Sequence, residues 1–353
     1  MILLEQEDYI KQIKAVTLLP LPWDKLNDKR ILISGATGMV GTCLVHVLTE
    51  VYKTYGFTGR IYALSRNSDK AKERFKSNGK VIDKIEFISH DINQKLCEIG
   101  NMDYIIHAAS NTHPVAYATD PIGTITTNVS GTFNLLDYAT THGAERFMLL
   151  SSVEVYGENK GDIDKFTEES CGYIDCNTVR AGYPEGKRVS ESLCQAYKAQ
   201  KGLNVVIARL ARTYGPTMLP SDTKAISQFI KKGVAGEDIV LKSSGTQFYS
   251  YVYVLDAVSA LLTIMLDGKD GEAYNISGLD SDVSLRDLAQ AIADISGRKV
   301  IFEMPDQVES AGYSKATKAV LDSSKLSVLG WESKYPINHG LERTINLLYQ
   351  GDN

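Results

Sequence analysis

The sequence predicts an α/β protein, built from a doubly wound parallel sheet and a smaller C-terminal lobe. Short apolar runs alternate with stretches of helical periodicity through the first part of the chain, which is typical of parallel strands covered by helices. The runs are continuously apolar instead of alternating with polar residues, as expected for strands buried on both faces. After residue 211 the pattern changes, which indicates a second lobe.

The predicted elements follow in chain order. Residues 1–28 predict a short amphipathic helix and a connector that contains proline. A main domain is expected over 29–210, with strands in RILISGATG and at 60–65, 84–89, 102–110, 146–152 and 204–210. The remainder, 211–353, is expected to form mainly the second lobe, with some segments at about 246–278 returning to the main domain.

The composition narrows the class of protein. The chain has 353 residues, of which 43% are hydrophobic and 23% charged, with a formal net charge of −5. These values suit a soluble enzyme and give no reason to expect nucleic acid or a membrane as partner. The N-terminal segment does not read as a secretory signal. Five scattered cysteines, without a ligand cluster around them, predict a reduced cytoplasmic protein with no metal site.

A glycine-rich turn carries the first functional signal. The segment GATGMVG places Gly35, Gly38 and Gly41 between the first strand and the next helix. Glycine permits a tight turn, a close approach of the backbone to a pyrophosphate, and close packing of the helix on the strand. The N-terminus of the helix then favours phosphate groups. This turn predicts a Rossmann-type dinucleotide-binding domain that holds NAD or NADP.

The choice between the two dinucleotides stays open in the sequence. No acidic residue follows the second strand to bind the ribose 2′-hydroxyl, and Ser65 and Arg66 stand there instead. Arg66 suits a 2′-phosphate, but equally an adenine ring or plain solvent exposure. Asp91, after the third strand, is a candidate partner of the adenine amino group or simply a turn residue.

A tyrosine, a lysine and a hydroxyl carry the second signal. Tyr183 and Lys187 lie four residues apart in a predicted helix, on one face of it. A tyrosine is normally neutral near pH 7, and a nearby ammonium together with a cationic nicotinamide would lower its pKa. Tyr183 then takes a proton from a sugar hydroxyl as hydride leaves the same carbon. Ser152, at the end of a predicted strand, would hold that oxygen.

These motifs resemble the extended short-chain dehydrogenase/reductases of the nucleotide-sugar type, the NAD-dependent epimerase/dehydratase family. The resemblance covers about residues 30–350 and includes HAAS, SSVEVYG, YPEGK and RTYGP. It implies Ser152, Tyr183 and Lys187 as the catalytic triad and Asn128 as a structural residue near the site. It also implies that Ser110 and Asn111 contact the substrate, and that the cofactor is lined by Thr37, Met39, Val40, Ile92, His107, Ala108, Ala109 and Ser110.

Glu154 separates the reactions of that family, whose sugar-modifying members share a 4-keto intermediate. The resemblance implies that 4,6-dehydratases carry an Asp-Glu pair after the hydroxyl residue, but the Asp position here is Val153. Simple 4-epimerases usually lack a carboxylate at position 154. The chain is most like UDP-glucuronate decarboxylase, whose relatives carry Glu without the preceding Asp. Glu154 would orient the sugar or a water near C5, or serve as a polar residue bound to neighbouring backbone.

Two positions depart from the decarboxylase pattern. The arginine expected in the segment GTQFYSYVYVLD is Tyr249, and the usual Asn before TYGP is Arg212. Arg212 would supply the missing charge from another direction, contacting the diphosphate. Arg180, three residues before Tyr183, is a second candidate for a carboxylate or phosphate, or an ordinary surface residue.

The sequence therefore leads to a nucleotide-sugar enzyme and leaves its reaction open. A decarboxylase-like reaction ranks first, C4 epimerisation second, and dehydration or net reduction after them. A dinucleotide-binding sensor is the non-enzymatic alternative, and the joint presence of Ser152, Tyr183 and Lys187 argues against it. A homodimer is expected by analogy, because the helix with the Tyr-Lys pair commonly packs on its partner's equivalent.

Overall fold

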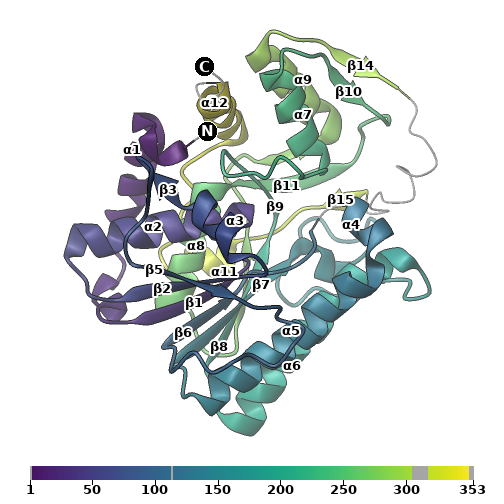
Figure 1. Ribbon diagram of the computed structural model, residues 1–353. Coiled ribbons are helices and arrows are strands. Elements are labelled where there is room, and N and C mark those ends of the chain that lie inside the picture. The colour runs from purple at the N-terminus through teal and green to yellow at the C-terminus, as the bar shows by residue number, and fades with distance from the viewer. Residues whose placement is uncertain (1, 113, 304–316, 350–353) are drawn as a thin grey trace.

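The central element is a parallel sheet of seven strands. The computed structural model describes residues 2–112, 114–303 and 317–349. Strand order is β12-β8-β7-β6-β1-β2-β5, and all neighbours are parallel (Figure 1). The strands are β1 Arg30–Ser34, β2 Arg60–Ser65, β5 Ile85–Ser89, β6 Tyr104–His107, β7 Arg146–Ser152, β8 Val205–Leu210 and β12 Ala273–Ile276. This confirms the predicted fold class.

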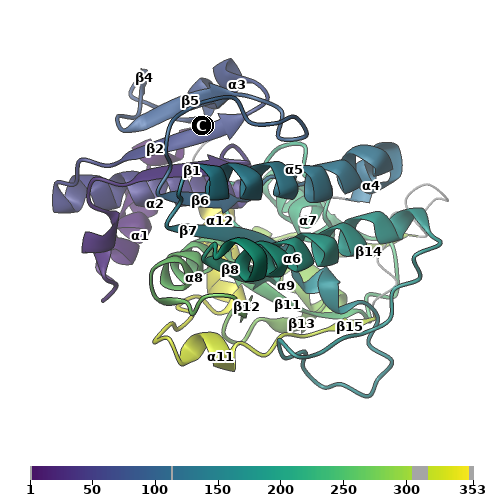
Figure 2. The same ribbon diagram turned by 90° about the horizontal axis from the view of Figure 1, so that it is seen from below.

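Both faces of the sheet are buried, and each strand divides its side chains between two cores. On β7, Phe147 and Leu149 belong to one apolar cluster, while Met148 and Leu150 belong to the other. The first cluster packs under α5 (Pro121–Thr141) and α6 (Gly182–Lys201), which lie side by side in Figure 2. Because successive strand residues point to opposite faces, a continuously apolar run is the pattern that two helical layers require.

The opposite face is covered by α2 (Met39–Tyr55) and α8 (Val254–Asp267), which pack against each other. Nearly every residue of α8 is buried, since the helix is covered on all sides. The N-terminal helix α1 (Glu7–Thr17) packs on both of them. The shorter helices α3 (Ser68–Arg74), α4 (Pro114–Thr119) and α11 (Ser324–Ser327) connect the layers.

The later part of the chain builds a smaller lobe beside the carboxyl ends of the strands (Figure 1). Its helices are α7 (Ala225–Val234), α9 (Leu285–Ser296) and α12 (Ile337–Tyr349), which pack on one another. Its strands pair as β10–β14 and as β13-β11-β15, with β9 joined to β11. They are β9 Arg212–Tyr214, β10 Ile239–Leu241, β11 Phe248–Tyr253, β13 Asp282–Ser284, β14 Val300–Phe302 and β15 Lys318–Ala319.

Some of this detail differs from the sequence-based expectation. Within the motif RTYGP, Arg212–Tyr214 forms strand β9, parallel to β11, and this strand was not expected. The small hairpin of β3 (Lys76–Ser77) and β4 (Lys80–Val81) was not expected. Within 246–278, β11 pairs in the second lobe, whereas α8 and β12 contribute to the main domain. Residues 304–316 and 350–353 of the expected lobe lie outside the described residues.

Candidate active site

A cleft of about 1080 Å³ lies at the carboxyl ends of the parallel strands, between the main sheet and the smaller lobe. This is where ligands bind in open α/β sheets. The residues predicted for cofactor, substrate and catalysis all line this cleft except Asn128 and His107, which are fully buried. The fold therefore gathers candidates that are more than 200 residues apart in sequence into one cavity.

The glycine turn has the geometry that a dinucleotide requires. Gly35 has φ +70°, and a Cβ there would lie 2.6 Å from the backbone nitrogen of Ala109. A Cβ on Gly41 would lie 2.8 Å from the Cα of Ala36, so the helix can approach the strand only without a side chain. Gly38 is the N-cap of α2, whose first N–H groups therefore open toward the cleft. These features fit a pyrophosphate.

The other end of the dinucleotide site is formed by the strand ends of β2 and β5. Arg66 is exposed at the edge of the cleft, directly after β2. The hydroxyl of Ser65 donates to the carbonyl of Asn67 at 3.0 Å. Asp91 lines the cleft and accepts a hydrogen bond from the backbone of Asn93 at 3.0 Å, so it closes a turn as well.

Ser152, Tyr183 and Lys187 converge at the centre of the cleft. Ser152 is the last residue of β7, and its hydroxyl hydrogen-bonds the phenol of Tyr183. Tyr183 lies in the first turn of α6, with Lys187 one turn further on. The Lys187 ammonium donates to the Leu150 carbonyl at 2.8 Å, which holds it against the end of β7. The structure thus brings together the three residues that the sequence analysis grouped.

Burial sets the protonation of this group. Burial raises the pKa of the Tyr183 phenol well above its usual range, Glu154 raises it further, and Ser152 and Arg180 oppose both. Burial also lowers the pKa of Lys187 to about 8, while the Glu191 carboxylate works in the opposite direction. In the chain alone the tyrosine is therefore neutral, and Lys187 titrates close to physiological pH.

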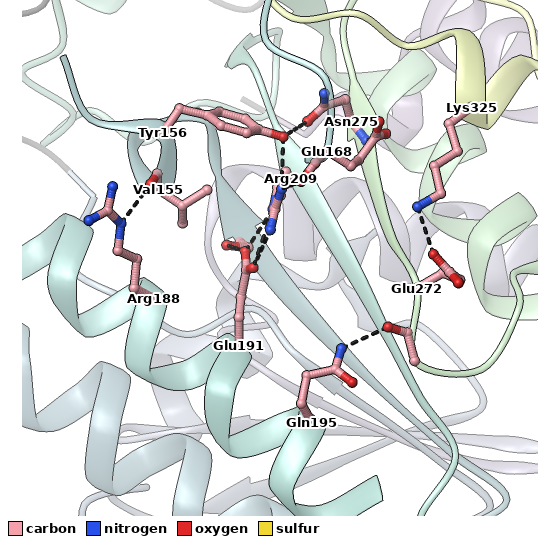
Figure 3. Close-up of polar contacts among 12 residues, drawn as sticks. Val155, Tyr156, Glu168, Arg188, Glu191, Gln195, Arg209, Glu272, Asn275 and Lys325 are labelled. Atoms are coloured by element: carbon pink, nitrogen blue, oxygen red, sulfur yellow. Dashed lines mark hydrogen bonds and ion pairs between the residues drawn. The ribbon is translucent and has the colours of Figure 1, made fainter. Parts of the chain in front are cut away.

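A polar network behind Ser152, Tyr183 and Lys187 links helix α6 to the sheet (Figure 3). Glu191, one turn after Lys187, accepts hydrogen bonds from Ser151 at 2.5 Å and from Arg209 at 2.7 Å. Arg209, on β8, also donates to the Tyr156 hydroxyl at 2.9 Å, and that hydroxyl donates to Asn275 on β12 at 2.6 Å. The network fixes α6 against β7, and with it the spacing of Tyr183 and Ser152.

Glu154 is held by an ion pair that the sequence did not reveal. Nη2 of Arg180 contacts both carboxylate oxygens, at 2.7 and 2.8 Å, and both side chains are mostly buried. The Arg180 guanidinium also lies over the ring of Tyr117, 4.6 Å from its centre. Tyr117 in turn lies 4.9 Å from the Tyr183 ring. Arg180 is thus part of the cleft and not a surface residue.

Arg212 and Tyr249 form a second unit on the wall made by the smaller lobe. The Arg212 guanidinium lies flat over the Tyr249 ring, with its carbon 3.4 Å from the ring centre. Its Nη1 is buried and has no hydrogen-bond partner. Burial raises the pKa of Tyr249, while the neighbouring Arg212 lowers it. The arginine that was expected at position 249 is absent, but the guanidinium of Arg212, from the neighbouring strand β9, lies on the Tyr249 ring.

Asn128 on α5, together with Ser110 and Asn111 in the segment after β6, supports the cleft. The Asn128 amide donates to the Thr124 carbonyl at 2.8 Å and accepts from the Ser110 hydroxyl at 2.9 Å. Asn111 donates to Thr124 at 3.3 Å. Asn128 is fully buried and bound within the protein, as expected of a structural residue.

Tyr117 is the site residue that sequence reasoning missed. It lies on the short helix α4, outside the recognised motifs, and no spacing pattern connects it to Tyr183 or Arg180. A tyrosine directly upstream of α5 was the one available signal, and such residues usually belong to the core. Its contact with Tyr183 arises only from the tertiary fold.

The fold and the cleft define a Rossmann-type protein of the short-chain dehydrogenase class. The chain belongs to the NAD-dependent epimerase/dehydratase family, whose model matches residues 31–277. A UDP-glucuronic acid decarboxylase 3 of Arabidopsis thaliana is 35% identical over 314 residues, which cover 88% of this chain and 86% of the relative. A UDP-glucuronic acid decarboxylase 1 of Xenopus tropicalis is 34% identical over 329 residues, covering 90% of this chain and 72% of the relative.

Solved structures are similar along almost the whole chain. DesIV, a dTDP-glucose 4,6-dehydratase of Streptomyces venezuelae with NAD bound, superposes with a TM-score of 0.77 at 25% identity, covering 91% of this chain and 97% of DesIV. A UDP-glucuronic acid 4-epimerase of Bacillus cereus has a TM-score of 0.75 at 21% identity, covering 91% of this chain and 99% of the epimerase. The second similarity concerns the fold alone.

The described residues form neither a membrane-spanning helix nor a metal-binding cluster. No described helix combines the length and apolarity needed to cross a membrane. Among the same residues, no cluster of three or more His, Cys, Asp or Glu side chains could hold a metal ion.

Proposed function

We propose that this protein is a redox-neutral, NAD(P)-dependent enzyme that removes CO2 from a nucleotide-bound uronic acid, a lyase similar to UDP-glucuronate decarboxylase. The observation that carries the proposal is Glu154, two residues after the strand-end Ser152, next to an apolar Val153 and within an ion pair that faces the cleft. The decarboxylase relatives, at 33–35% identity over most of the chain, support the same reaction.

The chain's own residues provide the acid-base chemistry. The bound nicotinamide dinucleotide supplies a reversible hydride acceptor. Ser152 holds the C4 oxygen of the sugar, and Tyr183 removes its proton and later returns it. Lys187, together with the positive charge of an oxidised cofactor, stabilises the phenolate against the burial that raises the pKa of Tyr183. A ketone at C4 makes the C5 carboxylate a β-keto acid, which loses CO2 readily.

Glu154 and Arg180 are proposed to act near C5. The pair places one carboxylate and one guanidinium beside the sugar end of the cleft, so the two charges can orient the sugar ring or a water molecule there. Epimerisation at C4 is the second candidate. Epimerisation needs no carboxylate. The observation that favours it is that Arg180 binds both oxygens of Glu154, so that this carboxylate is already engaged within the protein.

The experiment is a mass spectrum of UDP-glucuronate after incubation with the enzyme and either NAD+ or NADP+. Loss of the carboxylate mass supports the proposal, and an unchanged mass removes decarboxylation of this substrate. Proton NMR of neutral UDP-sugars then tests for inversion at C4.

Tyr183→Phe should abolish turnover with the fold retained, whereas surviving activity would contradict the proton relay.

We propose in addition that the protein is a homodimer through α5 and α6. Ile122 and Phe133 on α5 are 76% and 48% exposed, and Val189 on α6 is 41% exposed, which is unusual for large apolar side chains in one region. Phe133→Glu should convert dimers to monomers in sedimentation experiments. Val328→Glu, at an equally apolar but distant exposed position, is the matched control, and an unchanged mass for Phe133→Glu would exclude this interface.

A cytoplasmic location is also part of the proposal. Its support is the thiol content, since all five cysteines are free and three of them are exposed. Exposed thiols suit a reducing compartment. Localisation of a tagged full-length chain tests this directly.

A further inference from the structure

Arg212 is a mostly buried cation in the cleft without a carboxylate partner among the described residues. Two other cationic residues of the same cleft have one. Arg180 binds Glu154, and Lys224 binds Asp222 at 2.7 Å. Arg212 instead lies on the Tyr249 ring, and its buried Nη1 makes no hydrogen bond. Because burying a charge without a counter-charge, and a donor without an acceptor, is costly, such a group points to an anionic partner that arrives with the ligand.

The strand register places Arg212 at the sugar end of the cleft. Leu210, two residues earlier, is the registered neighbour of Ser152 across β7 and β8. Arg212 itself is registered with Tyr251 on β11, so its side chain lies beside Tyr249. Tyr249 in turn lies within electrostatic range of Glu154 and Arg180. Arg212 therefore belongs to the group around Ser152 and not to the distant dinucleotide turn.

The stacked geometry determines what Arg212 can bind. A guanidinium lying flat on an aromatic ring is held by a cation–π contact, and its N–H groups point outward in the plane. Such an edge matches the two oxygens of a carboxylate. Ser152 marks the C4 oxygen, and the carboxylate of a uronic acid is attached at the adjacent carbon, C5.

We propose that Arg212, positioned by Tyr249, binds the C5 carboxylate of the sugar and makes the cleft selective for acidic over neutral nucleotide sugars. This inference rests on the proposed function, because it takes Ser152 as the C4 contact. It assigns the substrate contact to an arginine on β9, next to the β11 position where the sequence analysis expected one and found Tyr249.

Binding measurements on the NAD+-saturated enzyme test this selectivity. Calorimetric titrations with UDP-glucuronate, UDP-glucose and UDP use a Tyr183→Phe background, so that no substrate is consumed. Arg212→Gln should weaken UDP-glucuronate binding by about 10- to 100-fold, the range for losing a charge-assisted contact, and leave the other two within about twofold. Tyr249→Leu should weaken UDP-glucuronate binding in the same sense, and Tyr249→Phe should retain it.

The matched control is Arg286→Gln. Arg286 also stacks on an aromatic ring, Phe302, but does not line the cleft, so all three affinities should stay unchanged. A melting curve shows that each variant is folded. If Arg212→Gln fails to fold, the three affinities are measured on Arg212→Lys instead. This variant keeps the charge but loses the planar pair of donors.

Two results would overturn the inference. One is unchanged UDP-glucuronate affinity in Arg212→Gln, and the other is an equal loss for all three ligands, which would assign Arg212 to the diphosphate. The proposed function is tested separately by CO2 release from the wild-type enzyme. Selective binding without CO2 release would contradict the reaction and leave the carboxylate contact standing.

Discussion

The carboxylate of Glu191, on α6, accepts hydrogen bonds from Nε and Nη2 of Arg209, at 3.0 and 2.7 Å (Figure 3). Both side chains are mostly buried. Glu191 lies one helical turn after Lys187 and raises the pKa of that lysine against the effect of burial. The ion pair thus links the ionisation of Lys187 to the packing of α6 on β8.

Glu191→Gln should move the alkaline limb of the pH–rate profile to lower pH. The pKa of Lys187 is about 8 because burial lowers it, and Glu191 and Cys194 oppose that shift. Without the Glu191 charge the ammonium is less stable, so it loses its proton at lower pH. Single-turnover oxidation at C4, followed by the absorbance of reduced nicotinamide across pH, measures this.

The control is Gln195→Ala, on the next turn of α6. Gln195 donates to the Gly271 carbonyl and stabilises the same helix without acting on Lys187. An equal pH shift in both variants, or a uniform rate loss in Glu191→Gln with no shift, would mean that Glu191 serves packing alone.

Glu154→Gln should slow product formation more than oxidation at C4. The substitution breaks the ion pair and leaves Arg180 without its carboxylate, so the unfolding free energy should also fall, by about 1–2 kcal/mol. Product is measured by mass spectrometry and oxidation by nicotinamide absorbance. Glu185→Gln breaks a comparable pair, with Arg188, outside the cleft and should change neither rate. Equal loss of both steps in Glu154→Gln would restrict Glu154 to binding.

Arg66→Ala should weaken NADP+ more than NAD+. Arg66 is exposed at the end of β2, where a ribose 2′ substituent would lie. A guanidinium there attracts the charged 2′-phosphate of NADP+, whereas the 2′-hydroxyl of NAD+ carries no charge. Fluorescence titrations with the two reduced cofactors measure both affinities. Parallel changes for the two would mean that Arg66 contacts the adenine or the solvent instead.

His107→Asn should flatten the acid dependence of stability. Burial lowers the pKa of His107 to about 3, whereas an unfolded histidine titrates near 6.5. Between these values the unfolded state binds one more proton, so stability falls as pH falls, by about 1.4 kcal/mol per unit. Urea unfolding across that range should show this slope reduced in His107→Asn. The exposed His339→Asn is the control, and an unchanged slope in His107→Asn would contradict the account.

Six of the seven parallel strands could be predicted because they are mainly apolar runs between glycine turns or helical stretches, and two helical layers demand that pattern. The seventh, β12, contains the polar Asn275 and was expected only as part of a segment that returns to the main domain. Ser152, Tyr183 and Lys187 were predictable for a similar reason. The helical spacing of Tyr183 and Lys187 and the order of all three residues after the glycine turn are visible in the sequence, and the structure places Ser152 at the end of β7 and the other two on α6.

The remaining contacts depend on tertiary packing that no local pattern encodes. Strand β9 is three residues long and has no period of its own, and it forms because β11 offers it a parallel edge. Glu154 and Arg180 are 26 residues apart, and Tyr117 reaches Tyr183 from another helix. Arg212 was noticed only as a departure from a pattern, and its stacking on Tyr249 required the structure.

The most direct test of the central claim is the fate of hydrogen at C4. The enzyme is incubated with UDP-glucuronate that carries deuterium at C4, and the mass of the product is measured by mass spectrometry. The account predicts a product that has lost CO2 and kept its deuterium, because the hydride removed at C4 returns to the same carbon. A product that has lost CO2 without ever exchanging hydride would retain the label too, so Tyr183→Phe is run in parallel and should form no product. An unchanged substrate mass, or loss of the deuterium, would contradict redox-neutral decarboxylation.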